Sequence, residues 1–180
     1  MVARINTGKS ISKALNYNEK KVQQGQAEIL SATNFLKDAD KMNFYEKAGT
    51  FEKLTSLNER TTTNTLHVSL NFDPSENICN DKMIAIADSY MKRIGFGEQP
   101  YLVYRHFDTG HPHIHIVSTN IQRDSNRISM HNMGRNQSEV ARKEIEIEFG
   151  LVKAESKKLT DALKLSPVNA QKINPGKRAT

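Results

Sequence analysis

The chain has 180 residues, of which 37% are hydrophobic and 26% charged, and its 26 basic against 20 acidic side chains give a net charge of +6. No stretch approaches the roughly 18 apolar residues that a membrane helix needs, and Cys79 is the single cysteine. These features exclude membrane spans, internal disulfides and cysteine-based zinc sites. They predict a soluble, cytoplasmic protein with one main core, whose basic bias favours an anionic partner.

The first sixty residues are expected to form two strands and two helices, at 2–5, 10–24, 26–34 and within 35–60. Ser10 is the expected N-cap of the first helix, and Gly25 is its expected end. Tyr17 lies about 140° from the apolar stripe that begins with Ile11 and Leu15 on a helical wheel. It is therefore not expected in the core.

From residue 65 onward, three strands and two helices are expected, at 65–72, 81–94, 101–107, 113–120 and 137–149. The turn Asp108-Thr109-Gly110 predicts a hairpin between the last two strands. Asn136 or Ser138 is the expected cap of the last helix, and Gly150 is its expected end. Helices interleaved with an antiparallel hairpin predict an α+β fold with a central antiparallel sheet.

Histidines are concentrated between His106 and His115, where four of the six in the chain lie within ten residues. Alternate residues of a strand share a face, so His113 and His115 point the same way, and the hairpin brings His106 beside them. Three converging imidazoles with open positions predict a catalytic metal site. Asp108 suits a role in orienting one of the ligand histidines.

Four further candidates are less decisive. His111 and His131 are expected to be ordinary polar residues. His67 lies on the polar face of its strand, and the sequence leaves open whether it lines the same surface as the clustered histidines. Tyr17 has lysines nearby that would help a phenol to attack phosphorus. The same geometry also fits an exposed tyrosine or one packed on the sheet.

The segment Tyr104-Arg-His106-Phe-Asp108-Thr-Gly-His-Pro-His113-Ile-His115 resembles the third motif of the conjugative relaxases, the mobilisation nucleases of plasmids, most closely their P-type group. That motif is His-x-Asp followed by His-x-His on a hydrophobic strand. The resemblance extends to the strand at 67–72, to Ile94-Gly-Phe96 and to Glu148-Phe149-Gly150-Leu151. It therefore covers about residues 1–155.

The resemblance implies a relaxase-like palm and a metal-dependent transesterase for single-stranded DNA. Tyr17 lies where the first motif carries the nucleophile, and it would attack the scissile phosphate at a transfer origin, keep the 5′-phosphate and release a 3′-hydroxyl. The ligands of the divalent metal would be His106, His113 and His115. Magnesium or manganese suits phosphate chemistry, while zinc, nickel or iron also suits imidazoles.

Other implied roles are less specific. Asp108 would orient His106 or help to take the proton of the tyrosine. Asn71 stands where some members carry serine, which leaves its role in positioning DNA open. Accessory mobilisation proteins are expected partners. Because relaxases usually continue into further domains, we expect a nicking domain at 1–151 and, at 152–180, a loosely ordered basic tail or the start of a further region.

Three other functions fit parts of the pattern. A rolling-circle replication initiator often places its tyrosine after the histidines. No tyrosine follows His115 here, which argues against this class. A non-catalytic DNA-binding module would hold a structural metal or none. A metal hydrolase that uses bound water as its nucleophile would keep its activity in Tyr17→Phe.

The basic side chains are unevenly distributed. Residues 151–180 hold seven basic and two acidic residues, residues 1–24 hold five and one, and residues 101–136 hold four and two. A DNA strand that crosses the tyrosine and histidine segments would need cations in these places. The side chains expected to contact DNA are Lys9, Lys13, His67, Asn71, Arg105, Arg123, Arg127 and Arg135.

Overall fold

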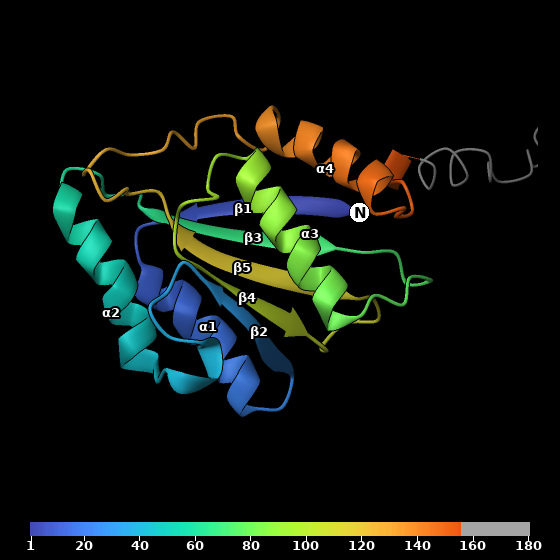
Figure 1. Cartoon of the computed structure of the whole chain (residues 1–180), viewed down its shortest axis with the longest axis horizontal. Helices are drawn as coiled ribbons and strands as arrows, with labels where there is room; N and C mark the ends of the chain where they lie inside the picture. Colours follow the sequence, from blue (N-terminus) through green and yellow to red (C-terminus); the bar gives the residue numbers. More distant parts are fainter. Residues whose placement is uncertain (156–180) are drawn as a thin grey trace, which may run out of the picture.

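The computed structural model describes residues 1–155, which form a five-stranded antiparallel sheet with helices on both faces (Figure 1). The strands lie in the order β1-β3-β5-β4-β2. In chain order they are β1 (Val2–Gly8), β2 (Ala27–Thr33), β3 (Thr65–Asn71), β4 (Tyr101–His106) and β5 (His113–Thr119). The helices are α1 (Ile11–Gln23), α2 (Phe44–Thr55), α3 (Asn80–Arg93) and α4 (Gln137–Glu148), with short 3-10 turns η1 (Ala39–Lys41) and η2 (Ser56–Asn58). The predicted α+β fold with a central antiparallel sheet is confirmed.

The two faces of the sheet serve different purposes. In β3, Leu66, Val68 and Leu70 are fully buried in the core formed with α3 and α4. Alternate side chains of a strand point to opposite faces, so His67 and Ser69 lie on the face that α1 covers. A second apolar cluster on that face joins α1 and α2 to β4 and β5. The sheet therefore keeps a polar area on one side without interrupting its larger core.

The helix ends follow local signals in most cases. The hydroxyl of Ser10 accepts a hydrogen bond from the backbone of Lys13, and Gly25 follows α1 with a φ of 70° that suits glycine, as predicted. Asn136 stands at the N-cap of α4, one of the two predicted positions, without the side-chain hydrogen bond that usually accompanies a cap. The hydroxyl of Ser138 lies 2.6 Å from that of Tyr90. Ser138 lies inside the helix, where it gives the buried phenol of Tyr90 a polar partner.

The first strand is longer than the predicted span 2–5. It pairs with β3 from Val2 opposite Asn71 to Gly8 opposite Thr65. Backbone pairing with β3 continues through Asn6 and Thr7. Because both side chains are polar, the hydropathy pattern did not show that the strand extends this far.

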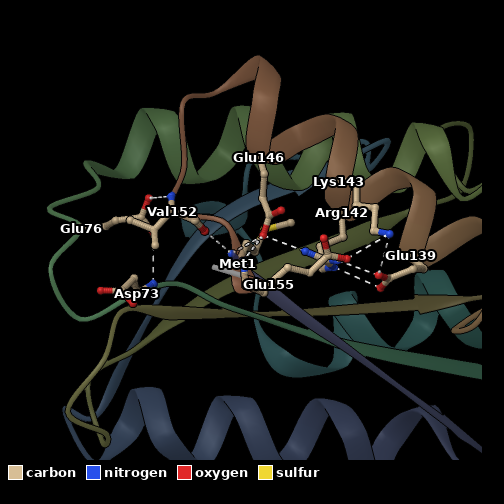
Figure 2. Close-up of polar contacts among 10 residues, drawn as sticks. Met1, Asp73, Glu76, Glu139, Arg142, Lys143, Glu146, Val152 and Glu155 are labelled. Carbon is tan, nitrogen blue, oxygen red and sulfur yellow. Dashed lines mark hydrogen bonds and ion pairs between the residues drawn. The ribbon is translucent and has the colours of Figure 1, made fainter. Parts of the chain in front are cut away.

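The start of β1 is tied to the end of the described chain. The amino group of Met1 donates to Glu146 at 2.7 Å and to the carbonyl of Val152 at 2.8 Å, and Arg142 donates to the same Glu146 at 2.8 Å (Figure 2). Residues 152–155 are therefore held against α4 and β1. The rest of the predicted tail, 156–180, lies outside the described residues. Among the described residues, no helix is long and apolar enough to cross a membrane.

Candidate active site

Three histidines meet where β4 ends and β5 begins. His106 and His113 are paired across these strands, and His115 follows on the same face of β5. One ring nitrogen from each of the three lies within 4.8 Å of the others. The structure therefore brings together the three residues predicted as metal ligands.

The geometry of this histidine cluster fits a divalent metal. Three ligand atoms arranged tetrahedrally around a metal with bonds of about 2.1 Å lie about 3.4 Å apart, so the rings would draw closer together when they bind it. Within the described residues, Nδ1 of His106 is buried and has no hydrogen-bond partner. A metal bond would satisfy this nitrogen, and imidazoles are ligands for zinc, nickel and iron.

The imidazoles are uncharged at neutral pH. Burial lowers the pKa of His106 to about 4 and that of His115 to about 3, and neighbouring imidazoles add to both shifts. Burial also lowers the pKa of His113 and of His67. Neutral imidazole is the form that binds metals, so the cluster is ready for a cation without first losing protons.

Asp108 lies beside the cluster in an ion pair with Lys21. Its Oδ2 is 2.9 Å from the ammonium of Lys21, while its Oδ1 is 3.4 Å from Nε2 of His113 and 3.9 Å from Nδ1 of His106. Partial burial works to raise the pKa of Asp108, but the hydrogen bond and charge of Lys21 outweigh it, so that the pKa is lowered. Asp108 is too far from His106 for a hydrogen bond, and another residue orients that ring.

Tyr17 covers the cluster from α1. Its ring stacks on that of His106 at a centroid distance of 5.9 Å, and it lies 5.9 Å from His115 and 6.0 Å from His67. Its side chain is 45% exposed, so a substrate can reach it. Of the five tyrosines, all within the described residues, Tyr17 alone makes ring contacts with histidines.

Asn18 is the site residue that sequence reasoning missed. It is fully buried, and its Oδ1 lies 2.8 Å from Nε2 of His106. Its Nδ2 donates to the carbonyl of Ala14 at 2.9 Å and lies 3.4 Å from Nε2 of His67. The signal was present, because Asn18 falls about 20° from Ile11 on the wheel, within the apolar stripe. A polar residue in that stripe requires buried hydrogen-bond partners.

The open question about His67 has a structural answer. Its Nε2 lies 2.9 Å from Nδ1 of His115, and the centroids of the two rings are 5.0 Å apart. Its side chain comes from the polar face of β3. His67 therefore borders the histidine cluster.

Two of the predicted cationic contacts also lie near the site. Lys9 and Lys13 line an open pocket of about 530 Å³ together with Tyr17, His67 and His115. Asn71 lies at the end of β3, where its Oδ1 is 3.2 Å from Nε2 of His111. The face that carries the cluster is thus bordered by cations on the side of α1.

The four predicted arginines are not brought to the histidine cluster. Arg105 precedes His106 on β4, points to the opposite face and donates to Asn80 at the start of α3. Arg123 and Arg127 are exposed in the segment that leaves the far end of β5. Arg135 lines a separate pocket beside α4. Strand alternation and the direction of β5 account for these positions.

The family model of the MobA/VirD2-like nuclease domain of relaxases matches residues 17–151. This range begins at Tyr17 and includes the three clustered histidines, Asp108 and all four described strands after β1. No curated protein gave a match. The family model covers most of the chain, and the fold and the cluster agree with it. The chain therefore belongs to the relaxases, DNA-nicking enzymes that act on single-stranded DNA, and carries their MobA/VirD2-like nuclease domain.

Proposed function

We propose that the protein nicks single-stranded DNA at a transfer origin by metal-dependent transesterification and forms a 5′-phosphotyrosyl adduct for conjugative mobilisation. The observation that carries this proposal is the position of Tyr17, whose ring lies within 6.0 Å of the rings of His67, His106 and His115. An exposed phenol over neutral imidazoles combines a nucleophile with a site for a cation.

The reaction exchanges one phosphodiester bond for another. The phenolic oxygen of Tyr17 forms a bond to phosphorus, the bond from phosphorus to the 3′-oxygen breaks, and that oxygen leaves as a 3′-hydroxyl after taking a proton. Asp108 is the proposed acceptor of the tyrosine proton, since its ion pair with Lys21 keeps it ionised. A bound divalent metal would polarise the phosphate oxygens and stabilise charge in the transition state. We propose magnesium or manganese in this role, while the imidazoles also suit zinc, nickel and iron.

The DNA strand is proposed to cross the α1 side of the cluster. Lys9 and Lys13 line the pocket that Tyr17 and His67 border, so they would neutralise the phosphates nearest the reacting one. Asn71 lies on the same face of the sheet as His67. Arg105, Arg123, Arg127 and Arg135 would contact DNA only outside the immediate site.

The wider setting is also part of the proposal. Residues 1–151 would act as the nicking domain, and the basic segment 152–180 would be a tail or the start of a further region. The enzyme would work in the cytoplasm, where the DNA of a mobile element is accessible, together with accessory mobilisation proteins.

Polarity of the adduct gives the decisive experiment. Single-stranded oligonucleotides with a randomised centre are incubated with the protein and manganese, and covalent complexes that survive denaturation are selected and sequenced. With the selected sequence, a label at the 3′ end should stay on the protein, and a label at the 5′ end should leave on a fragment with a 3′-hydroxyl. Tyr17→Phe should form no adduct, whereas Tyr45→Phe, which changes an exposed tyrosine on α2, should match the wild type.

Other outcomes would identify the alternatives. Cleavage without an adduct that survives Tyr17→Phe would indicate a metal hydrolase. DNA binding without cleavage, unaffected by metal and by His113→Ala, would indicate a non-catalytic module. An adduct of equal yield in Tyr17→Phe would refute the assignment of the nucleophile, and Tyr45 would then be tested.

A further inference from the structure

We propose that Asn18 is a positioning residue that, together with His67, sets which nitrogen of each clustered imidazole carries its hydrogen and so prepares the cluster for the metal. This inference rests on the proposed function, because it concerns the same metal site. The donors and acceptors around the rings determine these positions.

The carbonyl of Ala14 sets the orientation of the Asn18 amide. A carbonyl only accepts hydrogen bonds, so the amide nitrogen Nδ2 of Asn18 faces it at 2.9 Å. The amide oxygen then faces Nε2 of His106 at 2.8 Å, and that oxygen also only accepts. Nε2 of His106 therefore carries the hydrogen, which leaves the lone pair on Nδ1, the buried nitrogen without a partner.

His67 extends the same logic to the next ring. Nδ2 of Asn18 lies 3.4 Å from Nε2 of His67 with its second hydrogen on that side, which disfavours a hydrogen on this ring nitrogen and leaves its single lone pair to accept. A hydrogen on it would instead face the amide hydrogens of Asn18. Nδ1 of His115 lies 2.9 Å from the same nitrogen and must be the donor. The lone pair of His115 is therefore on Nε2.

The third ring is oriented by its own hairpin. Nδ1 of His113 lies 3.0 Å from the hydroxyl of Thr109 and 3.2 Å from the carbonyl of His111; since that hydroxyl donates its own hydrogen to the same carbonyl, Nδ1 of His113 carries the hydrogen. The lone pair is then on Nε2, which faces Oδ1 of Asp108 at 3.4 Å. A carboxylate that faces a lone pair with no hydrogen between them is satisfied by a cation. The structure thus assigns Nδ1 of His106 and Nε2 of His113 and His115 as the ligand atoms.

The position of Asn18 next to Tyr17 gives the network a second consequence. The Asn18 side chain holds α1 against His106 through one amide, and the preceding residue carries the phenol that stacks on the same ring. The placement of the nucleophile and the orientation of a ligand therefore depend on the same hydrogen bonds.

The direct test is the wild-type protein without metal. Long-range proton–nitrogen correlation NMR of the ¹⁵N-labelled, chelator-treated protein reports the tautomer of each neutral imidazole. We expect hydrogen on Nε2 of His106 and on Nδ1 of His67, His113 and His115. Hydrogen on Nδ1 of His106, or an averaged mixture at that ring, would overturn the proposal without any variant having to fold.

A pair of variants on α1 tests the role of the side chain. Asn18→Ala should convert His106 to a mixture of tautomers and weaken manganese binding by about 10–100-fold, as measured by calorimetry without DNA. Asn16→Ala, an exposed change on the same helix, should match the wild type in both measurements. Equal tautomers and equal manganese affinity in the two variants would refute the proposal. Both measurements are made without DNA and are independent of the adduct assay. If the wild-type protein shows the expected tautomers but forms no adduct with DNA, only the proposed function is refuted.

Discussion

Lys21 forms an ion pair with the carboxylate of Asp108, and its positive charge also interacts with the phenol of Tyr17. The pKa of Lys21 is raised, first by its hydrogen bond to Asp108 and also by the charges of Asp108 and Tyr17. The cation is therefore retained at any pH at which the enzyme would work. It is placed to stabilise negative charge that develops on the phenolic oxygen as its proton leaves.

Replacement of this cation should slow the chemical step. We expect Lys21→Met to lower the single-turnover rate of adduct formation by about tenfold, because a nearby opposite charge shifts the pKa of a group by about one unit or more. Lys20→Met, the exposed neighbour on α1, is the matched control and should keep the wild-type rate. Equal rates for the two variants would show that the charge of Lys21 does not assist the chemical step.

The residues of the site differ in how well the sequence predicts their positions. The clustering of His106, His113 and His115 could be predicted because strand alternation and one short turn, both local properties, determine where the three side chains point. Lys21 and Asn18 could not be assigned, because their partners, Asp108 and His67, are brought to α1 only by the folded sheet. The arginines were predicted from charge alone, and charge does not determine the face on which a side chain lies.

At the scale of elements, α1 packs against the core and also carries residues of the candidate active site. Ile11 and Leu15 are buried in the cluster shared with α2, β4 and β5, while the next turns carry Tyr17 and Asn18. The sequence predicted this helix, its cap and its end from local signals. It did not predict the strand order, in which β1 and β2 occupy opposite edges, because that order depends on pairing between distant segments.

Helix α2 offers a test of local stability away from the histidines. Asn43 and Glu46 form a capping box, in which each side chain bonds the backbone of the other. We expect Asn43→Ala to lower the free energy of unfolding by about 1 kcal/mol, and Asn43→Gly by only a few tenths, since glycine is tolerated at this position. Urea denaturation measures both changes. An unchanged free energy of unfolding in Asn43→Ala would show that the cap contributes little.

At the scale of the whole molecule, the neutral imidazoles make stability depend on pH. The pKa of buried His106 is about 4 and that of His115 about 3, whereas both return to the ordinary value of 6.5 on unfolding. The unfolded chain therefore binds more protons below pH 6.5. The metal-free protein should therefore have its full free energy of unfolding above pH 6.5, and this free energy should fall as the pH decreases towards 4.

Denaturation in the presence of a chelator measures this loss. Between pH 6.5 and 5 each such histidine contributes a slope of up to about 1.4 kcal/mol per pH unit. His115→Gln, which removes one of these groups, should give a shallower slope than the wild type. Identical slopes would contradict the assignment of His115 as a buried neutral imidazole.

The two-sided sheet also shapes how the protein tolerates mutation. Along β5, Ile114 and Ile116 face the large core, whereas His113 and His115 face α1. A scan of every substitution along this strand should therefore show a period of two. Changes at the isoleucines would reduce the amount of folded protein in the cell, and changes at the histidines would abolish mobilisation while protein levels persist. Selection for new DNA specificity could then act on one side of the sheet while the other side preserves the fold.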